Sequence, residues 1–478
     1  MSHSLTLHRH SSDSPVLTPE RGRALASKIL RMASPDANFI AITLVHTAQQ
    51  ITRFANNRLL STDDGDELRL QFHTGFGQKK DVTLKTNQLD DSALQDVVHR
   101  VEALGRLLPG NAVNIIPPQR TGAFTYLPVD LWRESTVNAL ATRPMIIPDM
   151  LDIVQSAGCI AAGFVGLMAR ASFVLNTDGQ EAYYRETDCE CTVTARTSNG
   201  KASGWHGQAS RAWDQIDPHV IATTAAKIAR QAANPQALEP GRRTAILSPA
   251  AVVQLVRLMT HAFDAGKTHD GWTPFSQTQP PHSKIGRRVF DPRISMWSDP
   301  ADPDGGYRPD FSEGLPEPKM SWVEQGVLRN LAFDPPYALQ QGNPYAGAPW
   351  SFHMSGGPTS VEEMIRSCDE GIYVNRVSGI EMLHEPSGLL TGVTRDGCFY
   401  VKHGKIERPV KNFRFTDSPW FFLNKLVSLG ASQRTAFGYT PASRMENGHE
   451  ETNWPRRPLI VPPLMVQDFN FNALADAV

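Results

Sequence analysis

Apolar and polar positions show two periodicities in the first part of the chain, one typical of helices and one typical of strands. Amphipathic helices are predicted where apolar residues recur every three or four positions, at 19–33 and 90–107. Between these segments, residues 38–62 are rich in β-branched side chains in partial alternation, with a turn signal at Asn56-Asn57. Two shorter runs, 67–75 and 81–87, predict a third and a fourth strand. The predicted order is helix, several strands, helix.

The same two periodicities continue to about residue 240. Helical spacing returns at 145–158 and 217–234. Between them, residues 161–207 alternate strand-like segments with the turn signals 176–179 and 198–200, which is typical of an antiparallel meander. A Pro- and Gly-rich connection at 108–130 precedes these elements, and a short linker at 235–243 follows them. We therefore place the domain boundary in this linker.

The second half opens with a short strand at 244–247 and a helix. Ser248 is expected to cap that helix, Pro249 to start it and Gly266 to end it. One apolar face is expected from Val252, Val256, Met259 and Phe263. Later elements are expected as follows: a hairpin turning at Gln325-Gly326, a helix over 358–371 capped by Thr359 or Ser360, strands over 371–377 and 397–410, a helix over 418–430, and an edge-like strand over 455–471.

These patterns predict an α+β protein with two domains. Residues 1–18 are expected to be a flexible leader, 19–240 the N-terminal domain and 241–478 the C-terminal domain. Helices packed on a mostly antiparallel sheet are expected in the first domain, and a curved or barrel-like antiparallel sheet with a few helices in the second.

Composition narrows the class of protein. Hydrophobic residues make up 40% and charged residues 20% of the chain, and the net charge is −2. These values are typical of a globular protein and give no basis for broad attraction to nucleic acid or to an anionic membrane. No apolar run reaches the length of a membrane span or of a signal peptide core. We therefore expect a cytoplasmic protein.

The thiols and the N-terminal histidines are weak candidates for chemistry. An odd number of cysteines, five, does not suggest a disulfide framework. Cys189 and Cys191 would lie on one face of a strand, where buried small side chains are favoured over a metal or redox pair. His3, His8 and His10 fit a polar leader better than a metal site. An acidic segment, 299–306, lacks the distal glutamate of a calcium loop and is interpreted as solvated.

The helix around His261 raises the question of zinc chemistry. A zinc peptidase needs two imidazoles and a third ligand, with one open position for water and a glutamate that takes its proton. This helix carries one histidine, His261, and the next histidine is His269. Because residues eight apart lie two turns from each other, the pair is a weak metal site. A surface or interface histidine near Asp264 is the favoured interpretation of His261.

Four stretches of the chain are characteristic of one family. They are TVTARTSNGKASGW (192–205), EQGVLRNLAFD (324–334), SVEEMIRSCDEGIYV (360–374) and HGKIERPVKN (403–412). On these stretches, nearly the whole of 20–478 resembles the TldD/PmbA (TldE) family of peptidase-related proteins. TldD-like members of the family carry H-E-x-x-x-H on the middle helix and a cysteine near the C-terminus, and they resemble zinc peptidases.

The resemblance assigns this chain to the subgroup without that motif. Arg257 and Leu258 stand where the family has His-Glu, Ala262 stands at the second histidine, and no cysteine follows Cys398. The chain therefore resembles the TldE/PmbA-like members, the metal-free partners of the TldD-like peptidase. No metal or catalytic residue is expected in this chain, and zinc is expected in the partner.

The resemblance implies a non-catalytic subunit of a heteromeric metallopeptidase that acts on unfolded or precursor peptides bound as extended strands. His353, Gly356 and Gly357 could line the substrate cleft by analogy. Two alternatives stay open. One is an active hydrolase that uses His261, His269 or the segment 353–360, and the other is a homodimeric peptide-binding protein without catalysis.

Overall fold

The structure is a computed structural model of the chain. It describes residues 14–33, 37, 39–76, 80–107, 131–142, 146–280, 282–305, 319–333, 337–338, 341–342, 347, 349, 351–437, 445–446, 449–450 and 458–475. Most of the expected leader, its three histidines and the connection 108–130 lie outside these residues.

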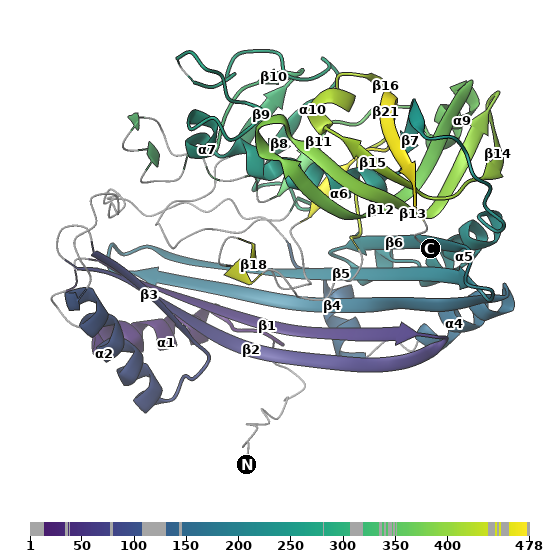
Figure 1. Ribbon diagram of the computed structural model, residues 1–478. Coiled ribbons are helices and arrows are strands. Elements are labelled where there is room, and N and C mark those ends of the chain that lie inside the picture. The colour runs from purple at the N-terminus through teal and green to yellow at the C-terminus, as the bar shows by residue number, and fades with distance from the viewer. Residues whose placement is uncertain are drawn as a thin grey trace.

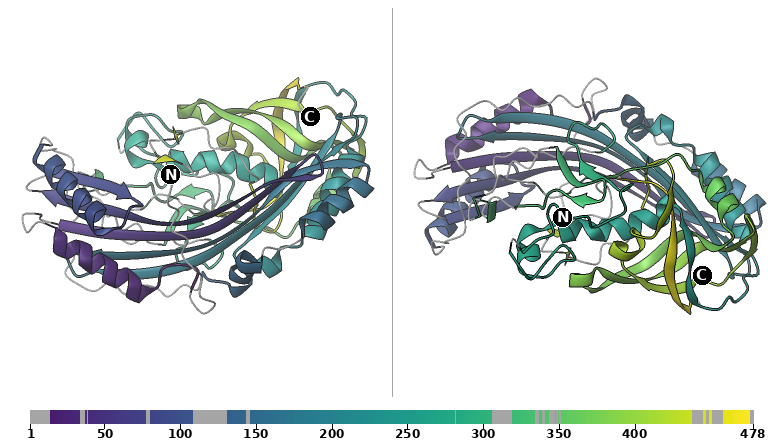
Figure 2. Two further views of the ribbon diagram at one scale, coloured as in Figure 1. Left: turned by 90° about the horizontal axis from the view of Figure 1, so that it is seen from below. Right: turned by 90° about the horizontal axis from the view of Figure 1, so that it is seen from above.

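A long antiparallel sheet forms the N-terminal half of the described chain. Its six strands run in the order β3-β2-β1-β4-β5-β6. Their bounds are β1 Phe39–Ala55, β2 Arg58–Phe76, β3 Lys80–Thr86, β4 Cys159–Asn176, β5 Glu181–Thr197 and β6 Ser203–Ser210. The sheet is curved, and the C-terminal half of the chain lies on its concave side (Figures 1 and 2).

Helices cover the other, convex face of this sheet. They are α1 (Pro19–Met32), α2 (Asp91–Leu107), α3 (Glu134–Thr142), α4 (Ile147–Ser156) and α5 (Pro218–Gln231), and the short 3-10 turn η1 (Trp213–Gln215) precedes α5. Apolar residues of all five helices share one buried core with the sheet. Gly204 of β6 allows the closest approach, because a Cβ atom there would lie 2.4 Å from the carbonyl oxygen of Ala225 in α5.

A closed five-stranded barrel forms the centre of the C-terminal domain. Hydrogen-bonded pairing runs β12-β7-β21-β15-β13 and returns to β12. The bounds are β7 Gly241–Leu247, β12 Glu370–His384, β13 Leu389–Lys402, β15 Phe413–Asp417 and β21 Leu464–Leu474, with β14 (Lys405–Pro409) and β16 (Leu426–Leu429) alongside. All barrel pairs are antiparallel except β7 with β12, so the predicted barrel-like sheet is confirmed with one parallel pair.

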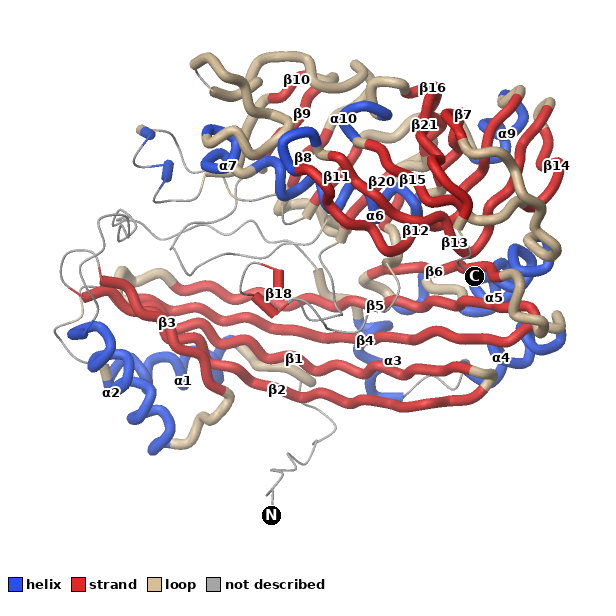
Figure 3. Tube along the Cα trace, viewed as in Figure 1, coloured by secondary structure: helices blue, strands red, loops and turns tan. Residues whose placement is uncertain are grey.

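A second sheet and short helices complete this domain (Figure 3). The sheet contains β8 (Met296–Ser298), β9 (Met320–Glu324), β10 (Val327–Leu328), β11 (Phe352–Met354), β17 (Gln433–Arg434) and β20 (Leu459–Val461). The helices are α6 (Pro249–Met259), α7 (Ala265–His269), α9 (Val361–Ser367) and α10 (Pro419–Phe422), with 3-10 turns η2 (Thr260–Phe263) and η3 (Glu385–Ser387). A two-residue ladder pairs β18 (Met445–Glu446) with β19 (His449–Glu450).

Several turn and cap predictions are confirmed. Asn56 and Asn57 have φ angles of 53° and 56°, the left-handed values that a tight two-residue hairpin requires. Gln325 and Gly326, with φ angles of 47° and 77°, connect β9 to β10 in the same way. Ser360 caps α9, and Glu363 completes a capping box.

Four predicted elements differ from the structure. The run at 67–75 is the second half of β2 and no separate strand. The edge strand predicted over 455–471 is divided in two: β20 pairs with β11 and β17 in the second sheet, and β21 lies between β7 and β15 in the barrel wall. The helix predicted over 358–371 is α9, which ends at Ser367, because Gly371 already belongs to β12. The helix predicted over 418–430 stops at Phe422, since Leu426–Leu429 pairs with β21.

Candidate functional site

Helix α6 begins as predicted but ends seven residues early. The Ser248 hydroxyl accepts a hydrogen bond from Ala251 N at 3.3 Å, and Pro249 occupies the first turn. After Met259 the chain forms a 3-10 turn, and at Asp264 it becomes extended. Backbone hydrogen bonds to Ala332 hold this break, one from Ala332 N to Phe263 O at 2.6 Å and one from Ala265 N to Ala332 O at 2.9 Å.

The three positions where the resemblance expects metal-site residues lie in and just after α6. Leu258 packs against the apolar core of the C-terminal domain, and Ala262 is buried in η2. Arg257 is half-buried, and its Nε atom is buried without a hydrogen-bond partner among the described residues. An alkyl group, a methyl group and a cation supply no lone pair to a metal, so these residues do not fit a zinc ion.

The two histidines near α6 lie on different segments. His261 is exposed on η2, and Asp264 uses its carboxylate to cap α7 by accepting from Lys267 N at 2.8 Å. His269 lies on α7, where its Nδ1 is 2.6 Å from the Tyr337 hydroxyl. Within the described residues, no group of three His, Cys, Asp or Glu side chains is placed to hold a metal ion.

A row of acidic side chains on β5 faces the C-terminal domain. Glu186, Asp188 and Glu190 are 6%, 7% and 4% exposed, and their spacing of two residues puts them on one face of the strand. Cys189 and Cys191 point to the opposite face, into the core shared with the helices, and are free thiols. Burial raises the pKa of Cys189 to about 12, which makes it an unreactive thiol.

Arginines from both domains pair with this row. Glu186 bonds to Arg170 of β4, and its other oxygen accepts from Arg211 Nη1 at 3.2 Å. Asp188 pairs with Arg434 of β17 in the C-terminal domain. We call Arg170, Glu186, Asp188, Arg211 and Arg434 the interdomain charge network. It joins the concave face of the long sheet directly to the C-terminal domain.

Two of these arginines also hold the acidic segment predicted to be solvated. Arg211 Nε donates to the carbonyl oxygen of Pro303 at 2.6 Å, and Arg434 Nη1 donates to that of Asp304 at 3.3 Å. The predicted solvated loop is exposed at Ala301, Pro303 and Asp304, and two of its backbone carbonyl oxygens also accept hydrogen bonds from arginines of the network. Nothing in the sequence of the segment itself signals these two distant partners.

The carboxylates of the network respond in opposite ways to burial. Burial raises the pKa of Glu186, but the charges of Arg170 and Arg211 outweigh it and hold that pKa below its ordinary value. For Asp188, burial prevails over the charges of Arg434 and Arg211 and raises the pKa. Glu186 is therefore a firmly ionised carboxylate between two cations, and Asp188 is the group of this pair that takes up a proton first.

His353, predicted as a possible cleft residue, lies buried beside the acidic segment. Its ring stacks on Trp297 with centroids 5.3 Å apart. Its Nε2 atom is 3.4 Å from Asp302 Oδ2, without a hydrogen bond, and a Cβ atom at Gly305 would lie 2.5 Å from it. Burial lowers the pKa of His353 despite the nearby charges of Asp302 and Asp299, so its imidazole is neutral at pH 7.

Gly356 and Gly357 follow His353 and pack backbone to backbone against residues 429–432. Gly357 N donates to Gly430 O at 2.7 Å. A Cβ atom at Gly356 would lie 2.6 Å from Ser432 N, and one at Gly357 would lie 2.6 Å from Leu429 O. Both positions therefore require glycine for a close backbone approach, and this accounts for the pair without a ligand.

The backbone of Phe437 connects β5 to α6. Its N–H donates to Glu190 Oε1 at 3.0 Å, and its carbonyl oxygen accepts from Gln254 Nε2 of α6 at 3.4 Å. The same carbonyl accepts from Arg376 Nη2 at 3.4 Å, and Arg376 lies over the ring of Trp205, 4.7 Å from its centroid.

The acid row of β5 was not among the predicted site residues, although the strict alternation of acidic and other residues in ETDCEC (186–191) is a signal for it.

Comparisons with known proteins agree on one family. The PmbA/TldA metallopeptidase central domain matches residues 147–233, and the C-terminal domain of the same family matches residues 240–473. No curated protein sequence matches the chain at a significant level. No helix among the described residues is long and apolar enough to cross a membrane.

Solved structures share the fold over nearly the full chain. A proposed modulator of a DNA gyrase from Thermotoga maritima has a TM-score of 0.73 and 17% identity, covering 94% of this chain and 98% of that chain. A proposed modulator of DNA gyrase from Bacteroides thetaiotaomicron has a TM-score of 0.76 and 16% identity, covering 96% and 100%. TldE from Thermococcus kodakarensis has a TM-score of 0.72 and 14% identity, covering 94% and 99%.

Proposed function

This chain belongs to the PmbA/TldD metallopeptidase family, and on that premise we propose that it is the metal-free, non-catalytic subunit of a heteromeric TldD/TldE-type peptidase. The observation that carries the proposal is the chemistry of the α6 segment. Leu258 and Ala262 are packed into an apolar core, and Arg257 is a cation. In this proposal a TldD-like partner supplies zinc, the general base and the attacking water.

The long curved sheet supports a role in holding substrate. Its concave side faces the C-terminal domain, and the Asp188–Arg434 pair joins the two (Figure 2). Among the described strands, β3 and β6 are the edges of this sheet, and an extended peptide adds to a sheet edge mainly through backbone hydrogen bonds, which tolerate many sequences. We propose that unfolded or precursor peptides are the substrates and that this subunit completes the chamber wall.

The zinc content of the purified, untagged chain tests the first part of the proposal. After dialysis against trace zinc, mass spectrometry is expected to find far less than one zinc per chain. About one tightly held zinc per chain would overturn the proposal and favour an active hydrolase. In that case the variant His261→Ala would decide whether His261 is a zinc ligand. If the variant no longer holds zinc, His261 is a ligand.

Reconstitution tests the partner. A family member with H-E-x-x-x-H from the same genome, mixed with this chain, is expected to form a heteromer in native mass spectrometry and to cleave an unfolded peptide. A glutamine in place of the partner's motif glutamate should abolish cleavage, whereas Arg257→Ala in this chain should preserve it. A stable homodimer that binds peptide and ignores every such partner would instead support the peptide-binding alternative.

A further inference from the structure

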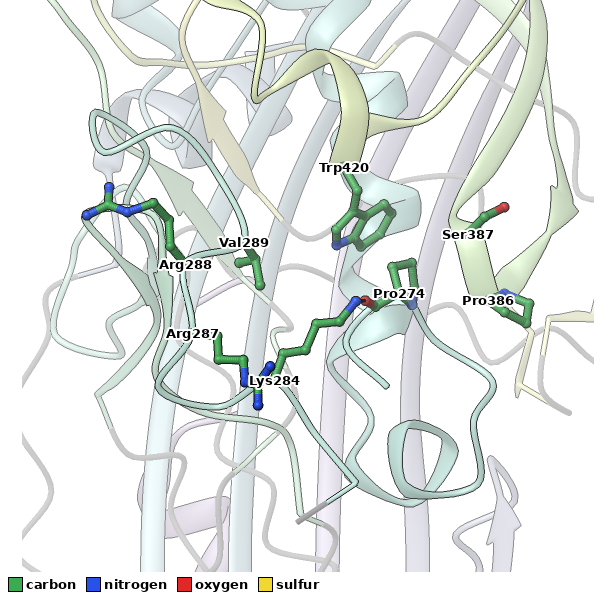
Figure 4. A pocket seen from close by; sticks show the side chains of 8 residues that line it. All are labelled: Pro274, Lys284, Arg287, Arg288, Val289, Pro386, Ser387 and Trp420. Atoms are coloured by element: carbon green, nitrogen blue, oxygen red, sulfur yellow. Dashed lines mark hydrogen bonds between the residues drawn. The ribbon is translucent and has the colours of Figure 1, made fainter. Parts of the chain in front are cut away.

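A pocket of about 480 Å³ opens on the C-terminal domain, away from the residues described above. The segment after α7, the tip of the β12–β13 hairpin and α10 enclose it (Figure 4). Its lining residues are Pro274, Lys284, Arg287, Arg288, Val289, Pro386, Ser387 and Trp420. Three of them are cations and none is acidic, so the pocket is electropositive.

Among the described residues, no acidic side chain pairs with Lys284 or Arg287, whereas Arg288 lies in the field of the Asp291 carboxylate. Lys284 Nζ donates to the carbonyl oxygen of Pro274 at 2.6 Å and extends toward Trp420 (Figure 4). Burial and the charge of Arg287 lower the pKa of Lys284. Arg288 extends away from this group and donates to Gln325 O at 3.4 Å. Lys284 and Arg287 therefore form the cationic side of the pocket.

Trp420 supplies both an apolar wall and a donor. Its indole packs against Phe275 and Phe290, with ring centroids 5.5 and 6.2 Å away. Its Nε1 atom is buried and has no hydrogen-bond acceptor among the described residues. A buried N–H without an acceptor is unfavourable, so a ligand that provides an acceptor is stabilised here. Pro274 and Pro386 extend the apolar surface.

We propose that this pocket binds a carboxylate attached to an apolar group, such as the C-terminal end of an apolar peptide. The carboxylate accepts hydrogen bonds from Lys284, Arg287 and the indole N–H of Trp420, and the apolar group covers the indole and the prolines. A bare inorganic anion satisfies the cations but leaves the apolar wall exposed to water. The volume is in the range of pockets for small organic ligands.

Calorimetric titration of the full chain with N-acetylphenylalanine and with its amide tests the proposal. The free acid is expected to bind saturably, and the amide at least tenfold more weakly. Arg287→Gln should weaken binding of the acid at least tenfold, because it removes a charged donor, whereas the adjacent Arg288→Gln should change it less than twofold. Trp420→Phe, which keeps a ring and removes the N–H, should weaken binding several-fold.

Several outcomes would overturn this site. Equal binding of acid and amide would show that the carboxylate is not recognised, and tighter binding of inorganic phosphate would show that the apolar wall is not used. Equal losses in Arg287→Gln and Arg288→Gln would indicate general surface charge, and absence of saturable binding would remove the pocket as a site. None of these results depends on zinc content or on a partner subunit, so the proposed function is tested separately.

Discussion

The acid row of β5 and helix α6 meet at the backbone of Phe437, yet they use charge in opposite ways. On β5, buried carboxylates are paired with arginines that reach in from both domains. On α6, the positions expected to hold a metal are apolar, or carry a cation with a buried, unpartnered Nε. Of these two regions, the acid row uses charge to join the domains, and α6 packs into the core.

This difference has an energetic consequence. Removing one member of a buried ion pair leaves the other charge in a medium that solvates it poorly, which is strongly unfavourable. Replacing an unpartnered polar group by an apolar one of similar size is close to neutral. Removing a charge from the buried acid row of β5 should therefore destabilise the protein strongly, whereas replacing Arg257 on α6 should leave it folded.

The largest effect is expected for Glu186→Gln. It removes the negative charge between Arg170 and Arg211, whose side chains are 23% and 3% exposed. We expect the free energy of unfolding to fall by about 3–5 kcal/mol, which urea titration followed by circular dichroism measures.

Glu181→Gln is the matched control on the same strand. Glu181 pairs with Arg23 at the surface, where solvent screens the interaction, so a much smaller loss is expected. Equal losses in Glu181→Gln and Glu186→Gln would contradict the central role that we give to the interdomain charge network.

The next effect is expected for Arg434→Met, and it depends on pH. This variant leaves Asp188 buried without its partner from the C-terminal domain. At pH 7 we expect a loss of about 2–3 kcal/mol, less than for Glu186→Gln because a single charge is orphaned. The loss should shrink as the pH falls toward 5, and unfolding curves at both pH values measure it.

The direction follows from the carboxyl group of Asp188. Its pKa is raised in the folded protein by burial, against the opposing charges of Arg434 and Arg211. A raised pKa contributes stability below the unfolded pKa, and this contribution is lost as the pH rises through the folded pKa. Removing Arg434 strengthens the rise, so protonation rescues the variant at low pH. A loss that stays constant from pH 5 to pH 7 would show that Asp188 is not the orphaned charge.

The local elements were predictable where the chain itself specifies them. Ser248 and Pro249 at the start of α6, the Asn56-Asn57 turn and the capping box of Ser360 act within a few residues. The end of α6 was not predictable, because Ala332, some seventy residues away, supplies the hydrogen bonds that replace the helix.

The candidate site shows the same limit. The family resemblance pointed to α6 from the sequence alone, and the absence of metal ligands at Arg257, Leu258 and Ala262 stays a prediction. The acid row had a visible signal in its alternation, but its partner Arg434 lies 246 residues further along the chain. Similarly, the strand pairing of Leu426–Leu429 with β21 overrides helical spacing in 418–430. Long-range pairing of this kind leaves no mark in the local pattern.

A smaller effect is expected for His353→Gln, which changes a residue beside the acidic segment that the interdomain charge network holds. The variant loses the stacking of the ring on Trp297, about 1 kcal/mol. Because burial lowers the pKa of His353, the unfolded chain binds the proton more readily, and wild-type stability falls as the pH drops below about 6.5. The variant should lose less stability than wild type between pH 7 and pH 5. His261→Gln, at an exposed position, is the control and should follow the wild type.

The smallest effect is expected for Arg257→Met, which tests the α6 side of the comparison. Arg257 is half-buried, and its Nε atom has no hydrogen-bond partner among the described residues, so methionine keeps the apolar stem and removes an unpaired donor. We expect the free energy of unfolding to change by less than about 1 kcal/mol, in either direction. Unfolding curves recorded beside those of Glu186→Gln measure the contrast. A loss in Arg257→Met as large as that on β5 would mean that Arg257 holds a buried anion, and the contrast between the two regions would then fail.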